Sequence, residues 1–235
     1  MSLVLREVKL SKPSCQLKYN LTVPEGEFLS ILGRQKSGRS ALLHLIAGFE
    51  FASSGEIFFR KVAFQNRAPS ERPLTIIFQD GNLFNHLNVF ENLALGIKGT
   101  LQINKKEADL IKEMIFYVGL EDSFSKTPSE LSMFQQQKAA IARSIVTGKS
   151  LLLLDEPFKN LTPEERDDLC LLLKMLHKKF NLTTVMVVSD TKEAIITSSL
   201  ATIIHEGRVF LTGKTKDVLK RFYKSLSPVD MQVVL

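Results

Sequence analysis

The amino-acid sequence predicts an α/β protein with a mostly parallel central sheet and a helical insert. Two observations lead to this prediction. Apolar runs of strand length, such as 151–155 and 183–188, are each followed by a segment with helical periodicity, which is typical of a parallel sheet covered on both faces. Between about Asn82 and Ile145 the periodicity is mostly helical, so this stretch is expected to form the insert.

The first part of the chain is expected to hold strands, short turns and one helix. Residues 2–10 alternate apolar and polar side chains, and residues 19–33 indicate a strand, a Pro-Glu-Gly turn and a more apolar strand. Apolar residues at helical spacing predict a helix that begins at Ser40 and stops at Gly48. The next elements are a strand stretch over 54–64, a loop over 67–73 and a buried strand over 74–79.

The second part is expected to alternate helices and strands. The clearest amphipathic helix of the insert covers residues 105–120. Thr162 is a predicted N-cap, because Pro163 follows at the first helical position and acidic residues fill the first turn. The last elements are an apolar strand over 183–190, a helix over 191–199 and a hairpin over 201–213 that turns at Glu206 and Gly207.

Length, charge and composition narrow the function classes. The 235 residues are 44% hydrophobic and 24% charged, which is an ordinary balance for one large domain or two small ones. The net charge of +6 suits an acidic partner, but the basic residues are scattered and their densest group, 214–224, is interpreted as a solvated helix face. No nucleic-acid partner is therefore expected.

The sequence predicts no disulfide framework, no metal cluster and no membrane span. Cys15 and Cys170 are the only cysteines, and the four histidines share no metal-ligand spacing. His44 is expected to pack or to lie at the surface rather than to bind a ligand. No apolar run reaches the roughly 20 residues of a membrane helix.

The stretch "ILGRQKSGRSALLHLIAG", residues 31–48, has the frame of a phosphate-binding loop. In such loops backbone N–H groups point at the phosphates, a lysine contacts the β- and γ-phosphates, and a Ser or Thr hydroxyl binds Mg²⁺. Here the lysine position holds Arg39, whose planar fork differs from a point charge, so weakened phosphate binding is expected. A plain strand-turn-helix explains this stretch about equally well when it is taken alone. The candidate nucleotide-binding residues are Gly33, Arg34, Gln35, Lys36, Ser37, Gly38, Arg39, Ser40 and Ala41, and Ser40 is also a candidate metal ligand.

Two carboxylates end the apolar strand in "SLLLLDEP". Asp155 is placed to hold the Mg²⁺ shell, and Glu156 is placed to orient or deprotonate an attacking water. A solvated strand end is the simpler interpretation of such a pair. Its position after a phosphate loop favours the catalytic interpretation.

Further motifs follow in a fixed order, namely "TIIFQDGNLF", "LSMFQQQKAAIARSI", "SLLLLDEPF" and "TTVMVVSD". Their order and spacing resemble the ATP-binding subunits of ABC transporters over nearly the whole chain, and "LIAGFEFASSGEI" is similar to the small-substrate importers, thiamine importers above all. The resemblance implies the P-loop NTPase fold of the ABC ATPase type, with an antiparallel β subdomain beside the parallel sheet. It implies a single domain over 1–235, with the α/β core in 1–80 and 146–235 and a helical subdomain in about 81–145.

The resemblance also implies ATP and Mg²⁺ as cofactors and adds residues to the site. Gln79 would reach the metal or the attacking water, which makes it a catalytic and a metal-binding candidate beside Glu156 and Asp155. Ser132 and Gln135 remain from the signature motif, which contacts the γ-phosphate held by the opposite subunit. The third catalytic candidate, Ser189, stands where the family has a histidine that contacts the γ-phosphate.

This sequence departs from the family pattern where hydrolysis takes place. Met133 and Phe134 replace the signature glycines, and Thr162 replaces the aspartate of a loop that crosses the dimer. No aromatic residue in "LSKPSC" can stack on adenine, although Tyr19 is a candidate to reach it. Together with the arginine and serine substitutions, these changes predict weak nucleotide binding, a weak dimer and slow hydrolysis.

The predicted function is therefore an importer subunit that couples ATP binding and hydrolysis to uptake of a small molecule, with thiamine as the candidate from resemblance. It would lie peripherally on the cytoplasmic face of the inner membrane. Its implied partners are transmembrane permease subunits, a second ATP-binding subunit in a homo- or heterodimer and, indirectly, a substrate-binding protein. Two alternatives stay open: a non-catalytic subunit that pairs with an intact ATPase, and a scaffold that binds no nucleotide. A DNA-handling ATPase is less favoured, because the chain has no coiled-coil arms and no basic stripe.

An apolar cluster of Phe84, Leu87, Val89 and Phe90 follows Gln79. Most of it is expected to form the core of the helical insert. By resemblance, one or two of its side chains, Phe84 first, are expected to be exposed and to face a short cytoplasmic helix of the membrane subunit.

Overall fold

The computed structural model describes residues 2–12, 15–79 and 82–225. Its central feature is one mixed sheet with the strand order β5-β4-β1-β2-β10-β9-β3-β8-β7-β6. The strands are β1 (Ser2–Lys12), β2 (Cys15–Pro24), β3 (Phe28–Leu32), β4 (Ser54–Phe59), β5 (Val62–Ala63), β6 (Leu74–Ile77), β7 (Leu151–Asp155), β8 (Thr183–Val187), β9 (Leu200–His205) and β10 (Arg208–Lys214). The α-helices are α1 (Arg39–Ala47), α2 (Val89–Lys98), α3 (Lys105–Tyr117), α4 (Met133–Val146), α5 (Pro163–Lys179), α6 (Thr191–Thr197) and α7 (Thr215–Ser225). Short 3-10 segments cover Pro69–Glu71, Glu121–Ser123 and Pro128–Glu130.

Strand pairing divides the sheet into a parallel and an antiparallel part. Strands β6, β7, β8, β3 and β9 run parallel to one another, whereas β1 pairs antiparallel with β2 and β4, and β4 with β5. β10 returns antiparallel to β9 and meets β2 through the parallel pair Arg208 and Lys18. The mostly parallel central sheet with an added antiparallel part is confirmed.

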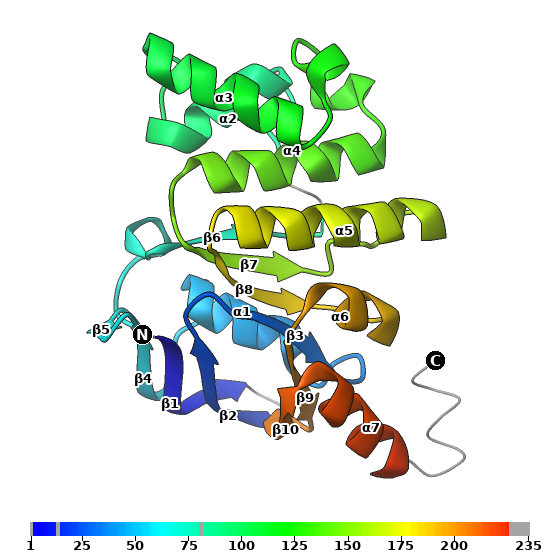
Figure 1. Ribbon diagram of the computed structural model, residues 1–235. Coiled ribbons are helices and arrows are strands. Elements are labelled where there is room, and N and C mark those ends of the chain that lie inside the picture. The colour runs from blue at the N-terminus through cyan, green and yellow to red at the C-terminus, as the bar shows by residue number, and fades with distance from the viewer. Residues whose placement is uncertain (1, 13–14, 80–81, 226–235) are drawn as a thin grey trace.

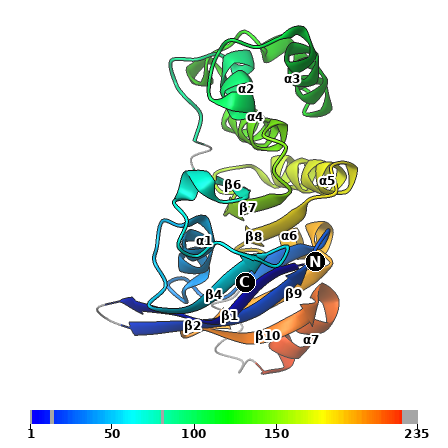
Figure 2. The ribbon, with the colours of Figure 1, turned by 90° about the vertical axis from the view of Figure 1, so that its left-hand side faces the viewer.

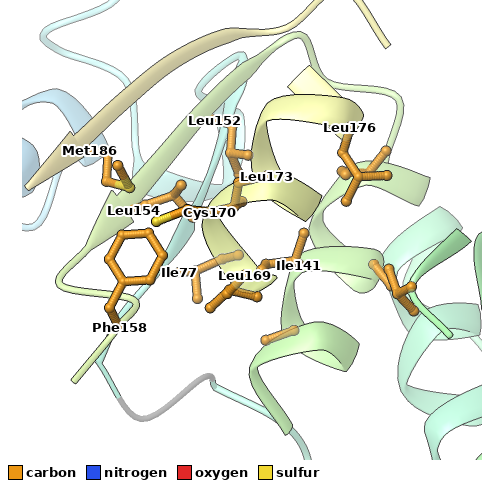
Figure 3. Close-up of a cluster of buried hydrophobic side chains, with 14 of the residues drawn as sticks. Ile77, Ile141, Leu152, Leu154, Phe158, Leu169, Cys170, Leu173, Leu176 and Met186 are labelled. Carbon is orange, nitrogen blue, oxygen red and sulfur yellow. The ribbon is translucent and has the colours of Figure 1, made fainter. Parts of the chain in front are cut away.

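Two hydrophobic cores cover the two faces of the parallel strands. In β7, Leu151 and Leu153 pack toward α1, while Leu152 and Leu154 belong to the core beneath α5. Figure 3 shows this second core, with Leu152 and Leu154 beside the buried side chains of α5. Burial on both faces explains why this strand is a continuous apolar run rather than an alternating one.

Helices α2, α3 and α4 lie together at one end of the molecule, and the antiparallel strands lie at the other (Figures 1 and 2). The three helices fall between β6 and β7 in the chain, where the helical insert is predicted. Helix α7 carries the basic group near the C-terminus, and Lys220, Arg221 and Lys224 are exposed there. Among the described residues, no helix combines the length and apolar character needed to cross a bilayer.

Most predicted boundaries lie within two residues of those observed. Helix α1 ends at Gly48, whose φ of 89° is the left-handed conformation that favours glycine. Thr162 caps α5 as predicted, because its side chain accepts a hydrogen bond from the Glu165 N–H at 3.3 Å. The predicted strand over 74–79 is too long, since β6 ends at Ile77 and leaves Gln79 in the segment beyond it.

Helix α1 is anchored near both ends by side chains from outside the parallel sheet. At its C-terminus the guanidinium of Arg72, 1% exposed, donates to the carbonyls of Leu45 and Ile46 at 2.7 and 2.8 Å. Such a cation satisfies carbonyls that lack helical partners and suits the negative end of the helix dipole. At the N-terminal end, the hydroxyl of Tyr19 donates to the carbonyl of Gly38 at 2.8 Å.

Candidate functional site

The phosphate-loop frame forms a tight turn between β3 and α1. Gly33 and Gly38 have φ values of 148° and 102°, which side-chain-bearing residues rarely adopt. A Cβ added to Gly33 would lie 2.2 Å from the carbonyl oxygen of Ile204, so only glycine fits there. The backbone N–H of Gly207, in the β9–β10 turn, donates to the Ser37 carbonyl at 2.9 Å and supports the loop from outside.

The loop has backbone N–H groups and a hydroxyl that are free to bind an anion. Helix α1 has no side-chain cap at Gly38, so the N–H groups of its first turn are open to a ligand. The hydroxyl of Ser37 is buried and has no hydrogen-bond partner within the described residues. Of the other predicted nucleotide-binding residues, Arg34, Gln35 and Lys36 are exposed. Ala41 instead packs against the core around α1. A cavity of about 360 Å³ adjoins the loop at Gly33, Arg34, Gln35 and Arg39.

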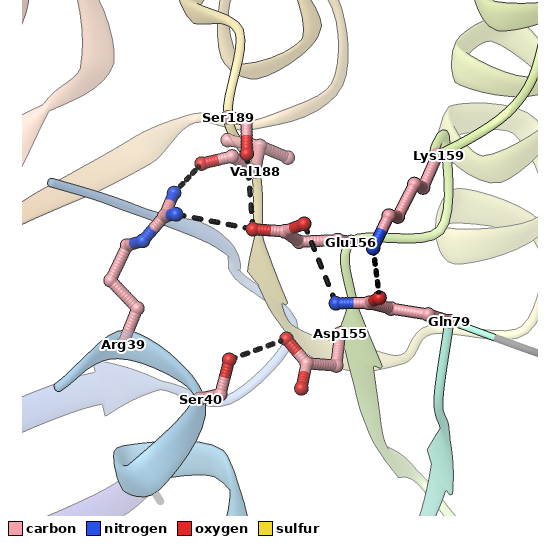
Figure 4. A network of polar contacts seen from close by, with 8 residues as sticks. All are labelled: Arg39, Ser40, Gln79, Asp155, Glu156, Lys159, Val188 and Ser189. Carbon is pink, nitrogen blue, oxygen red and sulfur yellow. Dashed lines mark hydrogen bonds and ion pairs between the residues drawn. The ribbon is translucent and has the colours of Figure 1, made fainter. Parts of the chain in front are cut away.

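The side chain of Arg39 does not point into the phosphate loop. It is 7% exposed, and its guanidinium donates to the carbonyl of Val188 at 2.6 Å and to the Oε1 atom of Glu156 at 3.1 Å (Figure 4). Burial lowers the pKa of Arg39, while Glu156 and Asp155 oppose that change. Because arginine stays protonated in proteins, the contact with Glu156 is an ion pair.

Glu156 is surrounded by hydrogen-bond donors. Its Oε1 atom accepts from the Ser189 hydroxyl at 3.0 Å as well as from Arg39, and its Oε2 atom accepts from the Gln79 side-chain amide at 3.4 Å. Glu156 is thus in contact with both of the other predicted catalytic residues, Gln79 and Ser189 (Figure 4). Both carboxylate oxygens of Glu156 therefore already accept hydrogen bonds from within the protein.

Asp155 lies deeper than Glu156 and faces helix α1. Its Oδ1 atom accepts from the Ser40 hydroxyl at 3.1 Å, and its Oδ2 atom lies 3.7 Å from the Nε2 atom of His44. Burial raises the pKa of Asp155, and the Ser40 hydrogen bond partly opposes this shift. Two predicted metal ligands, Ser40 and Asp155, are therefore in direct contact.

Gln79 is held by two further contacts besides the one with Glu156. The ammonium of Lys159, in the turn after β7, donates to its Oε1 atom at 2.7 Å. From α4, the side-chain amide of Gln137 donates to the Gln79 backbone carbonyl at 2.8 Å. The helical end of the molecule and the end of β7 thus both contact this residue.

Ser132 and Gln135 do not join this group. Each is hydrogen-bonded to the other across the first turn of α4, at 3.2 and 3.0 Å, in a capping box. Their contacts therefore lie within the helical end of the chain rather than at its own phosphate loop. The neighbouring Met133 is exposed, and Phe134 is half-buried against the core.

Tyr19 is unable to stack on a nucleotide base. Its ring is fully buried between β2 and α1, and its hydroxyl is used at Gly38. A Cβ on Gly38 would lie 2.7 Å from that hydroxyl oxygen, so the tyrosine packs directly on the loop backbone. The hypothesis that Tyr19 replaces the missing aromatic is therefore wrong for this structure.

The donor set fits a magnesium-bound nucleotide better than a metal held by protein alone. Mg²⁺ prefers oxygen ligands and usually takes one or two carboxylates together with substrate phosphates. Ser40 Oγ and the Asp155 carboxylate are oxygen ligands beside the phosphate loop, while Gln79 turns its amide nitrogen toward Glu156 and its Oε1 atom toward Lys159. Among the described residues, no three His, Cys, Asp or Glu side chains gather as a separate metal site.

Sequence reasoning missed three contributors to this site. The carbonyl of Val188 binds Arg39, Lys159 binds Gln79, and His44 faces Asp155. His44 lies four residues after Ser40 on one helix, so its spacing carried a signal that both side chains share a face. The other two contacts join residues about 80 and 149 positions apart and left no comparable local pattern.

Comparison with known proteins identifies the family. The family model described as ABC transporter matches residues 17–159, which is more than half of the chain. The chain belongs to the ABC transporter family. The thiamine import ATP-binding protein of Haemophilus influenzae is 38% identical over 205 residues, covering 87% of this chain and 95% of that protein. The protein of the same name from Aliivibrio fischeri is 37% identical, covering 86% of each chain.

Solved ABC cassettes share the fold. A nucleotide-free ATP-binding cassette from an ABC transporter superposes with a TM-score of 0.86 at 18% identity, covering 100% of this chain and 99% of that one. A dimeric ATP-binding cassette in a post-hydrolysis state, bound to ADP and Pi, has a TM-score of 0.78 at 26% identity, covering 91% and 98%. The ABC ATPase fold predicted from the motifs is thereby confirmed.

Proposed function

We propose that this chain is the ATP-binding subunit of an ABC importer, with thiamine as the candidate solute, and that it binds Mg-ATP weakly and hydrolyses it slowly. The importer class and the solute are supported by similarity to thiamine import ATP-binding proteins over most of the chain. Weak binding and slow hydrolysis are supported by the site itself.

The observation that carries the proposal is the position of Arg39. In a working phosphate loop the cation at this position contacts the β- and γ-phosphates. Here the guanidinium is paired with Glu156 and bound to the Val188 carbonyl instead. A phosphate group would thus meet the loop N–H groups without the full benefit of this charge. Recruiting the charge would require breaking a buried ion pair.

Each remaining residue has a role that its position supports. Ser40 and Asp155 would hold Mg²⁺, which when bound neutralises charge on the phosphates. Glu156 would orient or deprotonate the attacking water, which would compete with the donors that already contact both of its oxygens. Ser189 supplies a hydroxyl rather than a cation, so it adds little stabilisation to charge on the transferred phosphate.

The proposal includes two partners, a second ATP-binding subunit and a transmembrane permease. Ser132 and Gln135 would serve the site of a second ATP-binding subunit, because their contacts keep them at the helical end of their own chain. Phe84 is 44% exposed, as expected, whereas Leu87 and Val89 are buried. Phe84 would contribute to the surface that meets the permease, and the chain would then lie peripherally on the cytoplasmic face of the inner membrane.

A second candidate function rests on the start of α4. Exposed Met133 and half-buried Phe134 stand where small residues would let a backbone approach a phosphate. A subunit that cannot complete its partner's site fits a non-catalytic role beside an intact ATPase. In that pair this chain would supply Asp155 and Glu156 to one of the two sites.

Equilibrium binding of Mg-ATP to the purified chain, followed by steady-state ATPase assays, tests the proposal. Binding at micromolar to millimolar strength that Asp155→Asn weakens, with turnover that Ser189→His raises, supports an impaired ATPase. Binding without turnover in any variant favours the non-catalytic subunit. No binding by the wild type contradicts both and leaves a scaffold.

A further inference from the structure

The turn after β7 places a lysine on the side-chain oxygen that a metal would need. Lys159 follows Asp155 and Glu156 by four and three residues, and its backbone N–H donates to the Glu156 carbonyl at 3.2 Å. Glu156 and Asn160 both have positive φ, at 48° and 64°, so the turn folds back sharply. This geometry brings the Lys159 ammonium to within 2.7 Å of Gln79 Oε1 (Figure 4).

The contact determines which way the Gln79 amide faces. An ammonium group is only a donor, so the amide must present its oxygen to Lys159. The amide nitrogen then faces Glu156, where it donates to Oε2 at 3.4 Å. With this orientation, the only oxygen of the Gln79 side chain is bound to a cation that belongs to the protein.

We propose that the ammonium of Lys159 competes with Mg²⁺ for the side-chain oxygen of Gln79, and thereby raises the Mg²⁺ concentration that nucleotide binding requires. The proposal rests on the proposed function, because it concerns the same nucleotide site. A metal ion can bind Gln79 only through that oxygen, and it is repelled by a neighbouring positive charge. Lys159 is exposed, so its side chain is able to leave, and the contact weakens metal binding rather than preventing it.

The backbone of Gln79 is also held by the helical end of the molecule. Gln137 is 1% exposed and donates from α4 to the Gln79 carbonyl, so the main chain of this residue is fixed while its side chain can turn. Release of Lys159 would therefore free the amide without moving the segment that carries it. This makes Lys159 a positioning residue, acting through Gln79 rather than on the phosphates.

The test measures ATP binding at fixed ATP while MgCl₂ is raised from zero, with excess EDTA as the starting point. The variants are Lys159→Met, which keeps the length and removes the charge, and Lys159→Arg, which keeps the charge. Lys112→Met, at an exposed position on α3, controls for the loss of one positive charge. For Lys159→Met we expect the Mg²⁺ concentration at half-maximal binding to fall about three- to tenfold, in proportion to one partly solvated charged hydrogen bond. Lys159→Arg and Lys112→Met should stay near the wild type.

The Mg²⁺ titration distinguishes failure of the role proposed for Lys159 from failure of the proposed nucleotide-binding function. Equal Mg²⁺ dependence in all four proteins, with ATP bound, overturns the role of Lys159 and leaves the proposed function intact. A higher Mg²⁺ requirement in Lys159→Met also overturns it, because the lysine would then assist the metal. Absence of ATP binding at every Mg²⁺ concentration overturns the proposed function and this role together.

Discussion

Replacing Arg39 with lysine tests how the ion pair at the phosphate loop affects both stability and ligand binding. The guanidinium makes two charge-assisted hydrogen bonds in a buried setting, to Val188 O at 2.6 Å and to Glu156 Oε1 at 3.1 Å. A lysine has one compact head and cannot reproduce the planar fork that reaches both acceptors. One such bond is worth about 1.5–3 kcal/mol, so Arg39→Lys should lower the free energy of unfolding by about that amount.

The same free energy now opposes nucleotide binding, because a phosphate that recruits the charge must first break the pair. Removing that cost should tighten Mg-ATP binding by about tenfold or more, since 1.4 kcal/mol corresponds to a factor of ten. Urea unfolding of the nucleotide-free protein gives the first quantity, and titration calorimetry with Mg-ATP gives the second. Arg39→Met is the matched control, because it loses the pair without supplying a charge to the phosphates. It should be destabilised without a gain in affinity.

Two results would refute this reasoning. If Arg39→Lys leaves the free energy of unfolding within about 0.5 kcal/mol of the wild type, the buried pair contributes nothing to the nucleotide-free protein. If the variant is destabilised and also binds ATP more weakly, the arginine already serves the phosphates in the bound state. The pair would then not be the reason for weak binding.

Three further predictions concern turnover, the signature and pH. Glu156→Gln should bind ATP yet lose residual hydrolysis by about 10²-fold or more, in a phosphate-release assay, because an amide cannot accept the proton of water. Met133→Gly combined with Phe134→Gly should increase ATP-dependent dimerisation, measured by light scattering, since both changes open the backbone to a facing phosphate. Burial, and then the carboxylate of Asp190, raise the pKa of Glu193 from 4.5 to about 7. The folded protein therefore holds that proton more tightly, so wild-type stability relative to Glu193→Gln should fall by about 1–3 kcal/mol as the pH rises from about 4.5 to about 7.

Each of these predictions has a result that contradicts it. Unchanged hydrolysis in Glu156→Gln would show that another group activates water. A double glycine variant that stays monomeric with ATP would place the barrier to dimerisation elsewhere. Urea midpoints of wild type and Glu193→Gln that run parallel from pH 4.5 to 7 would show that the Glu193 carboxylate titrates in its ordinary range, with the Arg166 pair at 3.6 Å offsetting its burial.

The fold was largely predictable because its signals are local. The cap at Thr162, the stop at Gly48 and the apolar run of β7 each depend on residues within a few positions of one another. The family motifs then fixed the arrangement of these elements. The grouping of Glu156 and Gln79 was also predictable, because both follow neighbouring parallel strands at the same edge of the sheet.

The direction of individual side chains was not predictable in the same way. Sequence alone indicated that Arg39 keeps a charge at the loop, but its guanidinium binds a backbone carbonyl 149 positions away and the Glu156 carboxylate 117 positions away. Tyr19 had the right chemistry to stack on a base, yet β2 places it inside the core. In both cases the outcome depends on tertiary packing, which residue type and spacing do not encode.

The two anchors of helix α1 have a mechanical consequence. Arg72 ties its C-terminal carbonyls to the segment after β5, and Tyr19 ties its first residues to β2. The phosphate loop, the helix and the antiparallel strands are thereby expected to move as one rigid body. Gln79 is bound from α4 by the side-chain amide of Gln137, so we expect a displacement of Gln79 on nucleotide binding to reach the helical end through this hydrogen bond as well as through the shared core.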